Sequence, residues 1–155
     1  NILNNIIPGA VFVYFWSALD IGTFPSDNIV ESVILYYFCG LIVSRVASLV
    51  IEWFFKKVNL ISYAPKSEYI EATKRDKLIE TLLESNNMYR TFTGLFLVLV
   101  IAKAYVVAAN YFCIGQEISA WIVLIGLLCL FAGSFCKQTE HIRSRVETAL
   151  KDKET

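Results

Sequence analysis

The residues best able to do chemistry are four charged side chains that lie inside otherwise apolar stretches. Glu31, Arg45 and Glu52 belong to one such stretch, and Lys103 lies near the middle of another. At the centre of a membrane-spanning helix an ionisable group costs at least about 2.5 kcal/mol, so it is retained where it pairs with another group or faces a cavity. These residues therefore predict either an ion-paired helix interface or a polar passage.

Spacing places the first three charges on one face of a helix. They are seven or fourteen residues apart, and Ser48 lies between Arg45 and Glu52 at helical spacing from both. In a structural interpretation, Glu31 caps its helix, Glu52 lies among lipid headgroups, and Arg45 pairs with a carboxylate or carbonyl group of a neighbouring helix. In a functional interpretation, Arg45, Ser48 and Glu52 line a polar seam or pore at a subunit interface. The sequence leaves both open.

Lys103 needs a partner, because the middle of a span is the worst position from which a lysine can reach water. We expect a carboxylate of Glu31, Glu52 or Asp20, from another helix or another subunit, to supply it. Structural pairing and a functional cavity remain equal alternatives. The predicted intramembrane polar seam comprises Glu31, Arg45, Ser48, Glu52 and Lys103.

Other chemistry is missing from the sequence. His141 is the single histidine, and the cysteines, which are Cys39, Cys113, Cys129 and Cys136, form no CxxC pair. We therefore expect no metal site and no cofactor. No catalytic or nucleotide-binding motif is present, so we expect no enzyme. The net charge is zero, and we expect no direct binding of nucleic acid.

Hydropathy defines the helices that would position the charges. The 155 residues are 56% apolar with a mean hydropathy of +0.54, and the apolar residues gather in blocks. We predict one all-α domain over residues 1–155, a bundle of four transmembrane helices in an integral membrane protein. The expected spans are residues 5–20, 29–55, 91–112 and 119–137. Since the first residue is Asn1 rather than Met, we expect the natural start to lie upstream.

The four predicted spans differ in length. Residues 2–19 give only about 27 Å of helix, which is barely a span. The second begins at the N-cap Asn28, with Glu31 completing a capping box, and overruns the membrane. The fourth continues as one helix from about Ser119 to Leu150.

The polar parts form a cytoplasmic segment and a cytoplasmic tail. We expect the segment, residues 56–90, to hold a helix over 67–84 that breaks or bends at Ser85-Asn86-Asn87. The tail is residues 138–155.

The positions of the basic residues orient the chain. Seven lie in the central segment (Lys56, Lys57, Lys66, Lys74, Arg75, Lys77 and Arg90) and five in the tail (Lys137, Arg143, Arg145, Lys151 and Lys153). The loops 20–28 and 111–119 contain none. The positive-inside rule then places both termini in the cytoplasm, and we expect a bacterial inner membrane.

Small residues indicate close helix packing. Gly40, Ser44 and Ser48 follow one another at a spacing of four, and Gly126 and Gly133 lie seven apart. Such spacing lets two helix backbones approach within a subunit or between subunits.

Two stretches, LIVSRVASLVIEWFFKK (41–57) and ESNNMYRTFTGLF (84–96), resemble small bacterial four-helix membrane proteins of anti-phage defence loci, and the Kiwa membrane subunit family most of all. Membrane accessories of RADAR and of some CRISPR loci are similar in size and layout. The resemblance implies a homo-oligomeric scaffold that senses envelope disturbance and recruits a cytoplasmic effector. The matching residues are Ser44, Arg45, Glu52, Asn87, Tyr89 and Arg90, and the resemblance assigns a role to none of them.

We therefore expect an oligomeric membrane sensor or anchor in bacterial anti-phage defence that docks a cytoplasmic effector. We take four copies as the working number. The candidate docking residues are Lys74, Arg75, Lys77, Arg143 and Arg145. For the tail charges a solvated face is the favoured explanation, and a headgroup or partner-protein contact is the alternative. A pore-forming effector and a non-catalytic subunit of a larger membrane complex are the alternatives.

Overall fold

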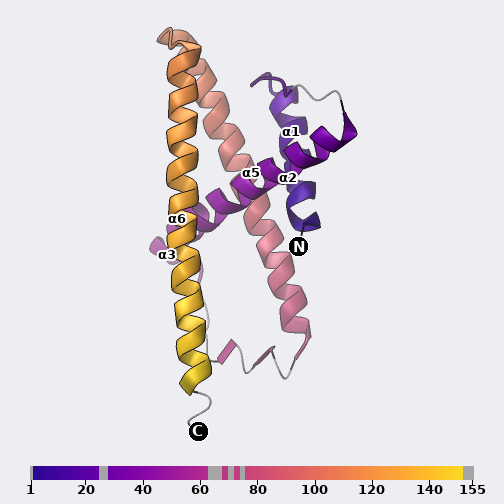
Figure 1. Ribbon diagram of the computed structural model, residues 1–155, viewed down its shortest axis with the longest axis vertical. Coiled ribbons are helices and arrows are strands. Elements are labelled where there is room, and N and C mark those ends of the chain that lie inside the picture. Colours follow the sequence, from indigo (N-terminus) through magenta and orange to yellow (C-terminus); the bar gives the residue numbers. More distant parts are fainter. Residues whose placement is uncertain (1, 25–27, 63–67, 70–71, 74–75, 152–155) are drawn as a thin grey trace.

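The computed structural model describes residues 2–24, 28–62, 68–69, 72–73 and 76–151, and within these ranges the regular secondary structure is helical, with turns and loops between the helices. The side chains of 145 and 147–151 are not described. The elements are α1 (Leu3–Ala18), α2 (Ile29–Val46), the π-helical turn η1 (Ala47–Ile51), α3 (Glu52–Lys57), α5 (Leu78–Tyr111) and α6 (Gln116–Lys151) (Figure 1). Helices α2, η1 and α3 run on without a break as one rod, Ile29–Lys57.

The rod crosses obliquely between two long helices. Helices α5 and α6 join at a short turn and diverge from it, and the rod contacts both of them (Figure 1). Near the turn, the Tyr105 hydroxyl donates to Ser119 Oγ at 2.8 Å. Helix α1 packs mainly against α2 and also touches α5. The small core, which comprises Phe12, Cys39, Val43, Leu95 and Leu99, lies where α1, α2 and α5 meet.

Three helices are long and apolar enough to cross a membrane, namely Ile29–Lys57, Leu78–Tyr111 and Gln116–Ser144. This confirms the all-helical class, and the length and composition of these three helices fit those of a helical membrane protein. The predicted count of four spans is not supported, because α1 has 16 residues and a length of about 24 Å, less than the roughly 30 Å hydrocarbon core.

Glycines bring the helix backbones into direct contact. A Cβ atom added at Gly9 would lie 1.6 Å from the Tyr36 carbonyl oxygen, and one at Gly40 would lie 1.8 Å from that of Asn5. The contact predicted for Gly40 is therefore present, and Gly9 is its partner. Gly94 of α5 makes a similar contact, where an added Cβ would lie 2.6 Å from the Cβ of Ala47.

The glycines of α6 do not pack in this way. Nothing lies within 4 Å of a Cβ added at Gly126, and at Gly133 only Leu49 Cδ1 comes near, at 3.4 Å. A close backbone contact at Gly126 or Gly133 within one chain is therefore not observed. Their role in packing between subunits stays a prediction.

The predicted cytoplasmic helix 67–84 is not one continuous helix, and its second part belongs to α5. Asp76 is not helical, and its Oδ1 accepts a hydrogen bond from Leu78 N at 2.8 Å, which caps the start of α5. Helix α5 then continues through Ser85-Asn86-Asn87, so the predicted break there is wrong. Residues 63–67, 70–71 and 74–75 lie outside the described residues, and with them two candidate docking residues, Lys74 and Arg75.

Three helices end in the left-handed backbone conformation without a glycine. Asp20, Asn59 and Cys113 have φ angles of 50°, 56° and 54°. In each case the next residue's N–H closes the helix by donating five residues back; Ile21 N, for example, donates to the Trp16 carbonyl at 3.1 Å. These ends fix the lengths of α1, the rod and α5.

Candidate functional site

Glu52 is the centre of an ion-pair cluster built from three helices. Its carboxylate lies 2.8 Å from Lys56 Nζ of the same helix, 3.4 Å from an Arg90 guanidinium nitrogen of α5 and 2.8 Å from Lys137 Nζ of α6. The Lys137 ammonium also donates to the Ser48 carbonyl and hydroxyl oxygens, at 2.6 and 2.9 Å. The Glu52 side chain is only 11% exposed. The cluster therefore ties α5 and α6 to the rod.

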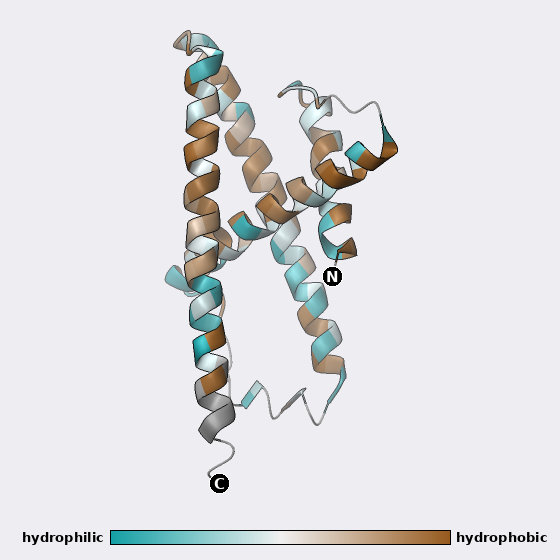
Figure 2. Cartoon of the chain, in the orientation of Figure 1, coloured by the Kyte–Doolittle hydropathy of each residue, from teal (hydrophilic) through white to brown (hydrophobic). Residues whose placement is uncertain are grey.

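The depth of this cluster matches one face of a bilayer. From Arg90 to Tyr111 along α5, and from Gln116 to Lys137 along α6, the helix length is about 32 Å. A hydrocarbon core is about 30 Å thick. Figure 2 shows the same division, with apolar residues between the cluster and the α5–α6 turn and more polar residues beyond it. The cluster thus lies at one boundary of the apolar band, and the turn lies at the other.

Glu52 is the carboxylate that these cationic groups share. One carboxylate serves three cationic groups, and Arg90 Nε is buried without a hydrogen-bond partner. Buried charges are strongly destabilising when their partner is removed, by about 3–5 kcal/mol. Glu52 therefore acts as the counter-ion on which the positions of Arg90 and Lys137 depend.

The π-helical turn η1 lies between Arg45 and Glu52 and sets their relative direction. A π turn inserts one residue into the helical register and is frequent at functional sites. Here Ser48 and Glu52 both reach Lys137, and Arg45 lines a small adjoining cavity of about 40 Å³ together with Ser48 and Lys137. The structure therefore brings together three of the five predicted seam residues: Arg45, Ser48 and Glu52.

The other two lie elsewhere. Glu31 is exposed in the first turn of α2, where Asn28 is the N-cap as predicted and accepts from Val30 N at 3.0 Å. Lys103 donates to the main-chain carbonyl of Leu19. Within the described chain its partner is therefore a carbonyl group and not the expected carboxylate. Within the described residues of one chain, the polar groups thus form separate sites and not one continuous path.

The sequence predicted Arg90 and Lys137 only as basic residues of the polar segments and did not predict their contact with Glu52. Their positions carry a signal, because each is the charged residue at the polar end of an apolar block. Their convergence on Glu52 depends on how the helices cross, which the sequence pattern does not specify.

A mixed groove of about 440 Å³ opens at the same boundary, between the start of α1 and the polar part of α5. Its lining includes Asn5, Ser44, Glu84, Asn87 and Arg90. Arg90 thus borders this groove and also belongs to the ion-pair cluster.

The fold and this site define a class: a helical protein with three helices able to cross a membrane, clamped together by ion pairs at one boundary. Among the residues that the structure describes, no three histidine, cysteine, aspartate or glutamate side chains gather as metal ligands. In comparisons with known proteins, no family model, no curated protein and no solved structure matches the chain.

Proposed function

We propose that the chain is a homo-oligomeric membrane anchor and sensor in bacterial anti-phage defence, whose cytoplasmic ends dock an effector protein. In this proposal the rod, α5 and α6 cross the inner membrane, and α1 enters it beside α2 as a short fourth helix. The basic residues at the ion-pair boundary and beyond it support a cytoplasmic location for that side and for both termini in this proposal.

The observation that carries the proposal is an exposed apolar stripe along α6. Seven large residues at the a and d positions of a heptad repeat are 52–74% exposed, and they are Ile118, Trp121, Ile125, Leu128, Phe135, Ile142 and Val146. Ala132 and Thr139 complete the pattern and are also exposed. This is the sequence pattern of a helix that pairs with another helix.

The stripe continues from the apolar band into the polar tail. Lipid tails can cover the apolar residues that precede Lys137, but Ile142 and Val146 lie beyond the ion-pair cluster, where water would meet them. They keep the register of the residues before them, so one partner helix would cover the whole stripe. A second copy of α6 has the same depth and direction in the membrane, and pairing in parallel sets like positions against each other.

The area of the stripe is sufficient for a stable interface. If each of the seven large residues contributes roughly 100 Å², two α6 helices bury about 1,400 Å² together, and stable interfaces bury about 1,200–2,000 Å². We propose four copies per assembly, built around this contact.

The docking surface for the effector would be the polar end of α5 and the groove beside it. Leu78, Leu82 and Tyr89 are 59%, 60% and 70% exposed there, although they lie beyond the apolar band. The groove lined by Ser44, Asn87 and Arg90 adjoins them. Lys77, directly before α5, would add positive charge to this surface, and Arg143 and Arg145 stay candidate docking residues on the tail.

The assignment to anti-phage defence rests on the resemblance of residues 41–57 and 84–96. In the fold these two stretches contact each other: Ala47 lies against Gly94, and Glu52 pairs with Arg90. The resemblance therefore covers one joined unit of the structure. The separation of the polar groups into distinct sites favours an anchor over a pore.

Cysteine cross-linking tests the oligomeric contact. With all four native cysteines replaced by alanine, single cysteines at Leu128, Phe135 and Ile142 should form disulfide-linked dimers in membranes after mild oxidation. Matched cysteines at Leu130 and Ser134, on the side of α6 that faces its own chain, should not. Equal cross-linking at both sets, or none at the first, would refute α6 pairing.

Co-purification tests the docking. The protein extracted in mild detergent should retain the product of its neighbouring gene, and Leu82→Asp together with Asn87→Trp should release that product while the assembly stays intact. A paired control, Val100→Asn, alters the exposed apolar part of the same helix and should retain it. If the wild-type chain stays alone under mild conditions, the docking proposal fails.

A further inference from the structure

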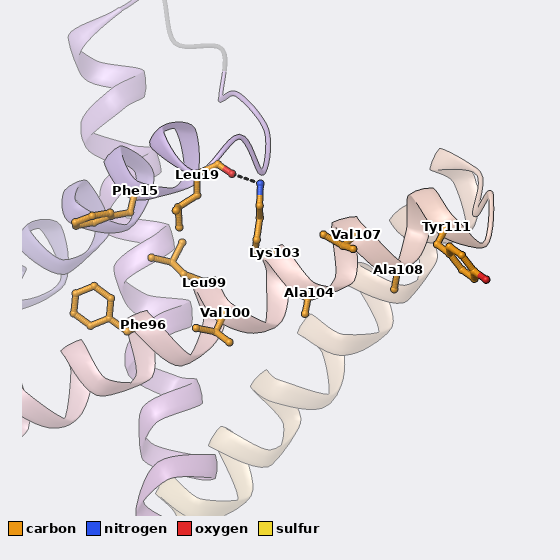
Figure 3. A pocket seen from close by; sticks show the side chains of 10 residues that line it. All are labelled: Phe15, Leu19, Phe96, Leu99, Val100, Lys103, Ala104, Val107, Ala108 and Tyr111. Atoms are coloured by element: carbon orange, nitrogen blue, oxygen red, sulfur yellow. Dashed lines mark hydrogen bonds between the residues drawn. The ribbon is translucent and has the colours of Figure 1, made fainter.

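An apolar groove of about 820 Å³ lies between α1 and α5, in the half of the apolar band nearer the α5–α6 turn. Figure 3 shows Phe15 of α1 and Leu19, the residue that follows α1, facing Phe96 and Leu99 of α5 across its inner end. Lys103 is the one charged residue of its lining. The volume lies within the range of ligand sites, which is about 300–1,000 Å³.

The groove exists because α1 is shorter than α5. The last turn of α1 ends at Leu19, whose carbonyl meets Lys103, whereas α5 continues for about 12 Å more to Tyr111. Val107, Ala108 and Tyr111 line this remaining part of the groove (Figure 3). The chain therefore leaves a step in the apolar band, with a lysine at its base.

The Lys103 ammonium has N–H donors, and a charge, that the described residues do not satisfy. An ammonium group has three donors, and the Leu19 carbonyl takes one. No carboxylate of the described residues forms an ion pair with Lys103. A cation without a counter-ion at this depth is costly unless an anion comes to it. An anion that belongs here must also carry long apolar groups, because the rest of the lining is hydrocarbon.

We propose that this groove binds an anionic phospholipid, with its phosphate on Lys103 and its acyl chains against the apolar lining of the groove, which includes Phe96 and Val100. The lipid neutralises the lysine and fills the step that the short α1 leaves. The inference rests on the proposed membrane crossing but not on the pairing of α6 or on effector docking. A negative cross-linking result would therefore not contradict the lipid site. Likewise, a negative lipid-binding result would not contradict α6 pairing or effector docking.

The test is lipid retention by the purified protein. Delipidated protein in dodecyl maltoside is mixed with dioleoyl phosphatidylglycerol, with dioleoyl phosphatidylcholine or with inorganic phosphate, and bound lipid is measured by native mass spectrometry. We expect phosphatidylglycerol to bind at least tenfold more tightly than phosphatidylcholine with the same chains, and inorganic phosphate to compete only weakly.

Three variants assign the site. Lys103→Gln should abolish the preference for phosphatidylglycerol, and Lys103→Arg should keep it. Ala104→Trp should fill the groove and weaken both lipids by a similar factor, while Lys57→Gln, which removes an exposed cation near Trp53 at the opposite boundary, should change neither. An unchanged preference in Lys103→Gln, equal binding of the two lipids by the wild-type chain, or binding of inorganic phosphate as tight as that of phosphatidylglycerol would overturn the proposal. If Lys103→Gln does not fold, the Ala104→Trp and Lys103→Arg results decide it.

Discussion

The charged residues near the two boundaries of the apolar band differ in whether they are paired within the chain. At one boundary the Glu52 carboxylate forms ion pairs with cations of its own helix, of α5 and of α6, so the charged groups are paired within the chain. Towards the other, Lys103 donates to a main-chain carbonyl and has no ion pair within the described residues. The first arrangement holds three helices together. The second contributes little to the fold and leaves a cation for a molecule from outside the chain.

Removal of Glu52 should have the largest effect. Glu52→Leu leaves Arg90 and Lys137, whose side chains are 25% and 29% exposed, without their carboxylate. Breaking a fully buried ion pair costs about 3–5 kcal/mol, so for these partly exposed groups we expect the lower end, about 3 kcal/mol of unfolding free energy. Unfolding with sodium dodecyl sulfate, followed by tryptophan fluorescence, measures it. Glu31→Leu is the control, and because Glu31 is exposed it should change stability by less than about 1 kcal/mol. If Glu52→Leu and Glu31→Leu lowered the unfolding free energy equally, Glu52 would stabilise the helix packing no more than an exposed surface charge does.

Closing the glycine contact should have the next largest effect. Gly40→Ala sets a methyl group against the Asn5 backbone, so the α1–α2 pair must separate, at a cost of about 1–3 kcal/mol. Gly126→Ala meets open space in mid-helix and should stabilise the chain by up to about 1 kcal/mol. The same detergent titration measures both. A stabilising Gly40→Ala would show that α1 does not pack on α2 so closely.

Loss of Lys103 should affect the delipidated protein only slightly. Lys103→Gln removes one hydrogen bond to a carbonyl and no ion pair, so we expect a change of about 1 kcal/mol or less. Thermal unfolding in detergent without added lipid measures it. A loss as large as that of Glu52→Leu would mean that the two boundaries are equally structural.

The smallest effect should come from the α5–α6 turn. Cys113 occupies the left-handed conformation that suits glycine, so Cys113→Gly should raise stability by about 0.5 kcal/mol. Cys129→Gly, at an exposed site within α6, should lower it by a similar or larger amount. Opposite shifts in melting temperature for the two variants are the expected result, and shifts of the same sign would contradict the strained turn.

The sequence by itself determined the helices and the placement of most charges. Hydropathy predicted the rod and the long C-terminal helix, and Asn28 predicted the start of the rod, because helix formation and capping depend on neighbouring residues. The continuation of α5 through Ser85-Asn86-Asn87 was missed. Asparagines favour turns only where no helix is imposed, and Asp76 supplies the cap earlier.

Only the tertiary structure decided which residues meet. Lys137 reaches Ser48 across 89 residues of sequence, and Lys103 reaches Leu19 across 84. No local pattern distinguishes the carboxylates that Lys103 was expected to contact from the carbonyl that it does contact. That choice follows from how closely Gly9, Gly40 and Gly94 let the backbones approach, and from where α1 ends. Helix crossings of this kind are fixed by packing over long separations, which the order of the residues does not display.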